Sequence, residues 1–167
     1  SVGFYVFAYL FVNMGAFGAV AIFEDKSGSC QIASYRGLAK TSPLLAHSLA
    51  VFLLSLAGIP PLAGFLAKYY IFASAIKVAG SDTGYSWLYW LVGIGLATAV
   101  FALYYYANVI KQMYFSADPS PYRIKYTAPA LSVIVISLVG VILFGLAPEP
   151  VLRFAGQMSE VFALIPR

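Results

Sequence analysis

The chain has 167 residues, of which 62% are hydrophobic and only 10% are charged, and its mean hydropathy is +0.86. Soluble domains carry about 25% charged residues, so this composition excludes a soluble globular protein and indicates an integral membrane protein. The net charge of +4 does not indicate nucleic-acid binding, because the basic residues lie in loops and form no patch with interleaved aromatic residues. Cys30 is the only cysteine in the sequence, which excludes an internal disulfide and a cysteine-based metal site.

The first apolar run predicts a membrane-spanning helix over residues 1–23, because about 20 helical residues cross the hydrocarbon layer of a bilayer. The run starts without an initiator methionine and lacks the basic region and cleavage site of a signal peptide. We therefore expect the sequence to be part of a longer polytopic protein. A polar loop is predicted over residues 24–42.

The next apolar segment, residues 43–79, is interrupted in its middle. Ser42 and Pro43 form a helix-start pattern, in which a capping hydroxyl precedes a proline that needs no N–H partner. The interruption, residues 58–64, holds the residues that helix interiors avoid: Gly58, Pro60, Pro61 and Gly64. An apolar segment interrupted in this way is typical of a broken membrane helix around an ion or substrate path.

Lys68 lies one turn beyond the interruption, among aromatic and aliphatic residues. An ionisable group at membrane depth is a candidate functional residue, and the predicted spans contain no Asp or Glu that could pair with it. Backbone groups freed by a break can line a polar cavity, and burial disfavours the charged form of a lysine. We therefore predict that Lys68 transfers protons. The alternative is a lysine that extends to the membrane surface, which is our interpretation of Lys77.

Two further features are weaker candidates for the same path. His47, near the start of the broken segment, could relay protons, but a single histidine near a helix end is often only an interfacial residue. Tyr104, Tyr105 and Tyr106 point in three directions at about 100° per residue, so we expect one of them to face the interior.

The remaining sequence predicts a turn over residues 80–86 and two further spans over residues 87–115 and 126–146. An amphipathic helix is predicted over residues 150–165, lying in the membrane interface or on a neighbouring subunit. The predicted fold is thus an all-α polytopic membrane protein with four crossings, one of them the discontinuous helix.

The distribution of basic residues supports a single crossing by the broken segment. A single crossing places the two basic loops, 24–42 and 111–125, on the same side of the membrane, which the positive-inside rule assigns to the cytoplasm. Two full crossings by residues 43–79 would separate these loops.

The run from Ser55 to Phe72, SLAGIPPLAGFLAKYYIF, resembles the antiporter-like membrane subunits of respiratory complex I, the proton-pumping NADH:quinone oxidoreductase. Residues 9–17, 35–38 and 104–110 agree with the same family, in order along the chain. The tyrosine pair after Lys68 and the triple tyrosine make the sequence similar to the subunit N (subunit 2) group in particular.

This resemblance implies a bundle of about 14 helices built from two inverted repeats, of which the present sequence would be the C-terminal part. It implies that Lys68 transfers protons in a half-channel, whereas His47 matches no motif of the family. The chain would be a non-redox subunit without a cofactor of its own, with NADH, FMN, iron–sulfur clusters and quinone bound by partner subunits. The expected partners are other membrane-arm subunits, the lipid bilayer, protons and water, without nucleic acid, in the inner (plasma) membrane of the cell.

Two other functions are compatible with the same residues. A subunit of a multisubunit sodium/proton antiporter would share the ancestry and the broken helix. A purely structural membrane-arm subunit would use Lys68 to hold a contact between subunits.

Overall fold

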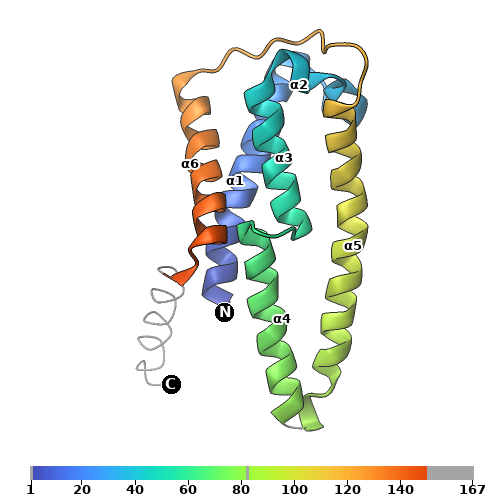
Figure 1. Ribbon diagram of the computed structural model, residues 1–167, viewed down its shortest axis with the longest axis vertical. Helices are drawn as coiled ribbons and strands as arrows, with labels where there is room; N and C mark the ends of the chain where they lie inside the picture. The colour runs from blue at the N-terminus through green and yellow to red at the C-terminus, as the bar shows by residue number, and fades with distance from the viewer. Residues whose placement is uncertain (1, 82, 150–167) are drawn as a thin grey trace.

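The structure, a computed structural model, describes residues 2–81 and 83–149, so the amphipathic helix predicted over 150–165 lies outside the described residues. Within the described ranges the regular elements are all helical, which confirms the predicted fold class (Figure 1). They are α1 (Val2–Ser27), η1 (Ile32–Tyr35), α2 (Leu38–Thr41), α3 (Pro43–Ala57), α4 (Ala63–Ser81), η2 (Thr83–Tyr85), α5 (Trp87–Tyr114) and α6 (Ala128–Leu146).

Helix α1 continues beyond the expected end of the first span. Residues 24–27 remain helical because Glu and Lys are good helix formers whose backbone hydrogen bonds need no membrane. The helix ends at Gly28, whose φ of 66° is in the left-handed region and whose N–H donates to the Glu24 carbonyl (2.8 Å). The predicted polar loop is therefore shorter than expected, and it also contains η1 and α2.

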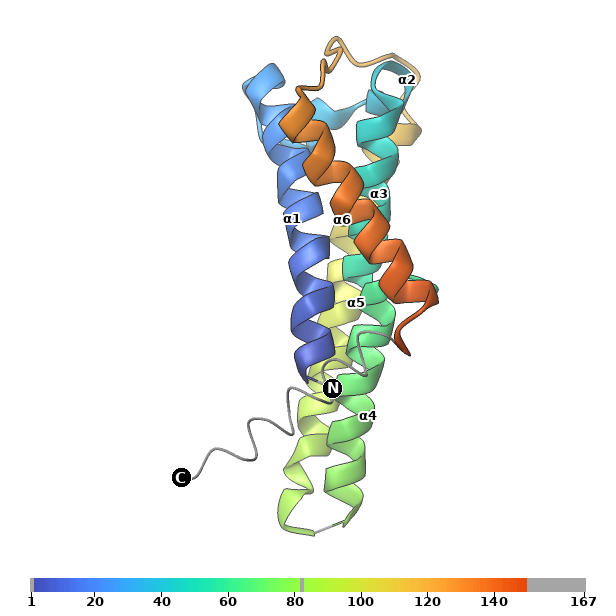
Figure 2. The same cartoon turned by 90° about the vertical axis from the view of Figure 1, so that its left-hand side faces the viewer.

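The two halves of the broken segment, α3 and α4, follow one another in the same direction, and α5 returns alongside them (Figure 1). The α4–α5 hairpin extends beyond the ends of α1 and α6, and α6 crosses α1 at an angle (Figure 2). Glycines allow the close contacts in this bundle: a Cβ at Gly15 would collide with the Phe52 ring, and one at Gly140 with the Phe11 ring.

The buried core has two parts. One lies toward the loop end of the bundle and includes Phe23, Leu38, Leu49 and Met113; the other lies around the break and includes Phe4, Phe52, Ala67 and Val141. The second cluster joins α3 and α4, the two halves of the broken segment, to α1 and α6, so two other helices pack around the interruption.

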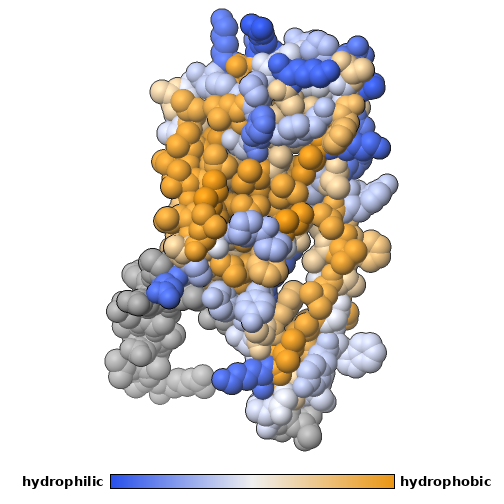
Figure 3. Space-filling model, in the orientation of Figure 1, coloured by the Kyte–Doolittle hydropathy of each residue, from blue (hydrophilic) through white to orange (hydrophobic). Residues whose placement is uncertain are grey.

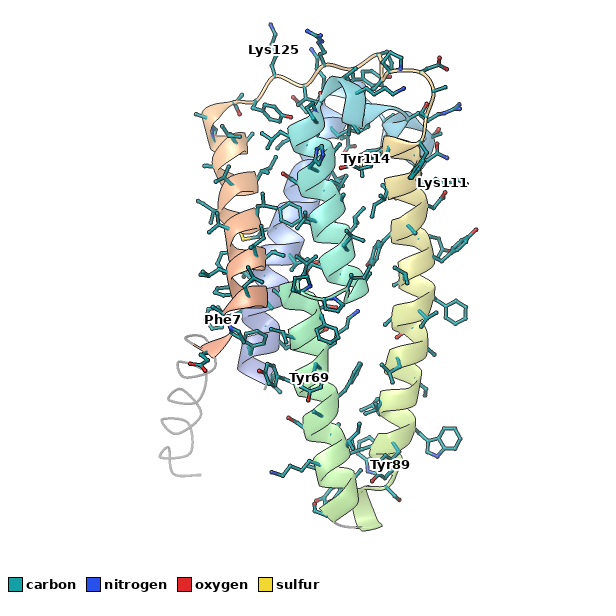
Figure 4. All side chains as sticks on the ribbon, in the orientation of Figure 1. Phe7, Tyr69, Tyr89, Lys111, Tyr114 and Lys125 are labelled. Carbon is teal, nitrogen blue, oxygen red and sulfur yellow. The ribbon has the colours of Figure 1, made fainter. Side chains whose placement is uncertain are left out.

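Three described helices, α1, α5 and α6, are long and apolar enough to cross a membrane, and α3 is a shorter apolar helix. The apolar surface forms a broad band below a polar end (Figure 3). Both basic loops lie at that polar end, where the Gly37 N–H donates to the Gln112 carbonyl (3.1 Å) and the Lys40 Nζ to the Ala117 carbonyl (2.6 Å). Lys111 and Lys125 lie at this end, and Tyr89 lies at the opposite end of the bundle (Figure 4).

The predicted capping role of Ser42 is wrong. Its hydroxyl makes no capping bond to α3 and instead accepts the Ile124 N–H (2.9 Å). The Tyr126 hydroxyl accepts the Leu45 N–H (3.2 Å), so a tyrosine distant in sequence satisfies a donor in the first turn of α3. The serine is thereby free to hold the segment that leads into α6.

Candidate functional site

The break between α3 and α4 is closed by a glycine cap. Gly58 has φ 88° and ψ 39°, a left-handed conformation that glycine adopts without steric cost. Its N–H donates to the carbonyls of Leu54 (3.1 Å) and Ser55 (3.0 Å), and the Ile59 N–H also reaches the Leu54 carbonyl (3.1 Å). Pro60 and Pro61 follow in the connection, where no helical N–H is required. These contacts satisfy the carbonyls of the last turn only as far as Ser55.

Lys68 supplies donors to the next two carbonyls. Its Nζ donates to the Leu56 carbonyl (2.8 Å) and, at a longer distance, to the Ala57 carbonyl (3.4 Å). Side chains on a helix lean toward its amino end, so a long lysine in the second turn of α4 reaches back to the end of α3. The carboxyl end of a helix carries partial negative charge, which attracts an ammonium group. Among the described residues, the half-buried amine is therefore bound by backbone carbonyls.

Gly58 also makes room for the lysine stem. A Cβ at Gly58 would lie 3.3 Å from the Lys68 Cδ, closer than ordinary packing allows. The left-handed backbone conformation therefore favours glycine at this position, and the missing side chain also lets the lysine stem pass close to it.

Gly64 is part of α4 and not of the interruption, which ends one residue before Ala63. The predicted extent of the break, 58–64, is therefore too long. The Gly64 N–H donates to the Ser55 Oγ (3.0 Å), and a Cβ on Gly64 would collide with the Ser55 carbonyl. A Cβ at Gly145 of α6 would likewise collide with the Pro61 carbonyl. Two helices thus lie directly on the backbone at the break.

Two cavities border Lys68. One of about 410 Å³ lies between α1, α4 and α5, and four of its lining residues carry hydroxyl groups: Tyr5, Tyr9, Thr98 and Tyr106. The other, of about 330 Å³, is lined mainly by apolar side chains of α4 and α5, together with Tyr69. The lysine is therefore placed between a cavity that can hydrogen-bond water and one that is largely apolar.

One tyrosine of the triple faces the interior, as the helical geometry predicts. Tyr104 and Tyr105 are 75% and 65% exposed, whereas Tyr106 is half-buried and lines the hydroxyl-bearing cavity. The sequence alone could not select Tyr106 from the three.

His47 is not brought together with Lys68. It is exposed on α3, its Nδ1 lies 2.6 Å from the Pro43 carbonyl, and its ring packs edge-on against Tyr114. Ten residues separate it from the end of α3 at Ala57, which is about 15 Å of helix. Lys77 is exposed toward the far end of α4.

Sequence reasoning did not single out Ser55, Tyr9 or Gly145 as parts of the site. Ser55 could have been found, since it is a polar residue within an apolar helix three positions before the break. Gly145 and Tyr9 belong to helices distant in sequence, and only the packing places them at the break and its cavity.

These features define a helical membrane protein built around a discontinuous helix with a lysine at its break. Residues 1–102 match the family described as NADH:quinone oxidoreductase/Mrp antiporter, TM. The chain belongs to this family.

Similar proteins extend the match to nearly the whole chain. The NADH-quinone oxidoreductase subunit N of Moorella thermoacetica is 38% identical over 163 residues, which are 97% of this chain and 33% of that protein. The chloroplastic NAD(P)H-quinone oxidoreductase subunit 2 of Zygnema circumcarinatum is 46% identical over 132 residues, 78% of this chain and 25% of that protein.

The fold is also similar to a solved structure. A chain in respiratory complex I from Thermus thermophilus with bound aureothin matches with a TM-score of 0.69 and 30% identity, over 90% of this chain and 33% of that chain. The present chain thus spans about a third of the length of the relatives it matches.

Proposed function

We propose that the chain is part of a proton-translocating membrane subunit of NADH:quinone oxidoreductase, in which Lys68 carries the proton at the break between α3 and α4. The family and its subunit N relatives support the assignment to such a complex. The observation that carries the role of the lysine is the contact of its Nζ with the Leu56 and Ala57 carbonyls, next to a hydroxyl-lined cavity.

The geometry suits an amine that alternates between two protonation states. An ammonium group has three N–H donors, of which two are directed at the end of α3. The negative end of the helix dipole stabilises this charged form, while the apolar cavity and the surrounding lipid destabilise it. These opposing effects are the basis of the proposed uptake and release of one proton by the amine.

Water in the hydroxyl-lined cavity is the proposed partner of that transfer. Tyr9 of α1 and Tyr106 of α5 face the cavity from two helices and can hold water within reach of the lysine. The side chains of the second cavity offer few such partners, so the proton is proposed to enter or leave on the tyrosine side.

In this proposal the redox chemistry takes place in other subunits. NADH, FMN, the iron–sulfur clusters and quinone are assigned to partner subunits, and this chain contacts other membrane-arm subunits and lipid. The protein is placed in the plasma membrane with its basic loops, 24–42 and 111–125, in the cytoplasm. The position of both loops at one end of the bundle supports this orientation.

The test replaces Lys68 by methionine in the full-length subunit within the intact complex. Proton pumping per NADH oxidised is measured in sealed vesicles with a pH-sensitive dye, next to a matched Lys77→Met variant on the same helix. We expect pumping to fall in Lys68→Met and to be retained in Lys77→Met, since Lys77 is exposed and distant from the break.

Normal pumping by an assembled Lys68→Met complex would refute the proposal and favour a structural role. Proton movement driven by a sodium gradient and independent of NADH oxidation would instead indicate a sodium/proton antiporter subunit.

A further inference from the structure

Ser55 is a fully buried polar residue in the last turn of α3. Its Oγ accepts the N–H of Gly64, the second residue of α4, at 3.0 Å. The first N–H groups of a helix lack partners within that helix, so a residue of the preceding helix caps α4. Ser55 thereby links the two helices across the interruption.

The same face of α4 makes the lysine contact. Gly64 and Lys68 are four positions apart, so they lie above one another on one side of the helix. On α3 their partners are consecutive: Gly64 binds the Ser55 side chain, and Lys68 binds the Leu56 carbonyl. The absence of a Cβ on Gly64 lets its backbone lie directly on the Ser55 carbonyl. The serine bond therefore fixes the separation between the end of α3 and the turn of α4 that carries the lysine.

We infer that Ser55 is a positioning residue for proton transfer, which holds α4 so that the Lys68 amine stays on the Leu56 and Ala57 carbonyls. The inference rests on the proposed function of Lys68. Without the serine hydroxyl the first turn of α4 loses its cap, and the lysine loses part of the support for its charged form.

The groups around Lys68 simplify the expected pH response. The titratable side chains that line its cavities are the phenols of Tyr5 and Tyr9 on α1, Tyr69 on α4 and Tyr106 on α5, and the residues of α3 that line them are not titratable. No carboxylate of the described residues lines either cavity. No carboxylate would therefore contribute to a change in the alkaline limit of pumping, and among the groups that titrate in that range the lysine is the one held by the end of α3.

The test compares Ser55→Ala with Ser48→Ala in the full-length subunit of the intact complex. Ser48 is on the same helix and is equally buried, but its Oγ has no hydrogen-bond partner among the described residues. The two variants remove the same atom from similar surroundings, and only one removes the bond to α4. A Ser55→Thr variant, which retains the hydroxyl, serves as the conservative substitution.

For Ser55→Ala we expect pumping at neutral pH to fall about threefold to tenfold, the range that one hydrogen bond supports. The alkaline limit of the pumping profile should also move to lower pH by about half to one unit. Ser48→Ala should match the unmodified protein, and Ser55→Thr should restore most of the profile.

An unchanged pH profile in Ser55→Ala would overturn the inference, including the case in which only the thermal midpoint of the complex falls. If Lys68→Met reduces pumping while Ser55→Ala has a normal profile, the positioning role is wrong and the proposed function stands. If Lys68→Met pumps normally, the proposed function itself is wrong.

Discussion

The contact between Gly64 and Ser55 can be tested by adding one methyl group. In Gly64→Ala the new Cβ would overlap the Ser55 carbonyl oxygen and carbon, and it would lie 3.0 Å from the Ser55 Oγ. The obstacle is mainly backbone, which cannot rotate away as the end of a flexible side chain could. Either α4 must withdraw from α3, or the Gly64 N–H must lose its bond to the serine.

The expected change in stability of the Gly64→Ala variant is the sum of three contributions. Replacing glycine by alanine in a helix contributes about 1 kcal/mol of stability. Forcing extra volume into a packed contact costs about 1–3 kcal/mol, and losing the serine bond costs about 1 kcal/mol. The net effect of Gly64→Ala is a destabilisation of about 1–3 kcal/mol, in spite of the better helix propensity of alanine.

Gly80→Ala is the matched control on the same helix. Among the described residues, a Cβ there would meet only the Tyr89 hydroxyl, at 3.4 Å, which is ordinary van der Waals contact. We expect this variant to be neutral or more stable by up to about 1 kcal/mol. Both variants are made in the full-length subunit, and the thermal midpoint of the purified complex is measured in detergent together with proton pumping.

The two variants should therefore differ in the direction of their effect. Gly64→Ala should lower the thermal midpoint and reduce pumping, and Gly80→Ala should do neither. Equal thermal midpoints and equal pumping in both variants would refute the close contact between α4 and the end of α3.

Two further predictions address the cavity and the loop end. Tyr106→Phe should slow pumping several-fold, because it removes a hydroxyl that lines the cavity beside the lysine. Tyr104→Phe should have no effect on pumping, since that side chain is 75% exposed. Equal pumping rates of the two variants in vesicles would contradict the role of the cavity. A hydrogen bond with Glu24, together with its negative charge, raises the pKa of the Cys30 thiol. The thiolate fraction at pH 8 is therefore reduced, so Glu24→Gln should accelerate alkylation of Cys30 by a membrane-impermeant maleimide added from the cytoplasmic side. An unchanged rate would argue against this pairing, and labelling only from the opposite side would reverse the proposed orientation.

Composition and local pattern determined much of this protein. Long apolar runs indicate helices, because a single span in lipid can satisfy its backbone groups within its own segment only as a helix. Gly58, Pro60 and Pro61 end a helix by local steric effects, so the break could be located from the sequence. Lys68 could also be selected from the sequence, because a charged residue within an apolar segment is recognisable without tertiary information.

Boundaries and partners depended on contacts that a linear pattern does not contain. The capping of α3 by Tyr126, in place of Ser42, joins residues distant in sequence, and local capping rules cannot anticipate it. The sequence pattern places Gly64 in the break because glycine is unfavourable in helices, yet in the structure Gly64 is a helical residue whose missing side chain permits close packing.

The sequence by itself thus determined that the chain is a helical membrane protein with a lysine after a broken helix, because those properties follow from side-chain chemistry and backbone sterics along a single segment. Only the tertiary structure decided what the lysine amine contacts, which tyrosine of the three shares its cavity, and that Ser55 and Gly145 hold the break. These are distances between separate helices, and they are set by how side chains pack across the bundle rather than by the order of residues within any one helix.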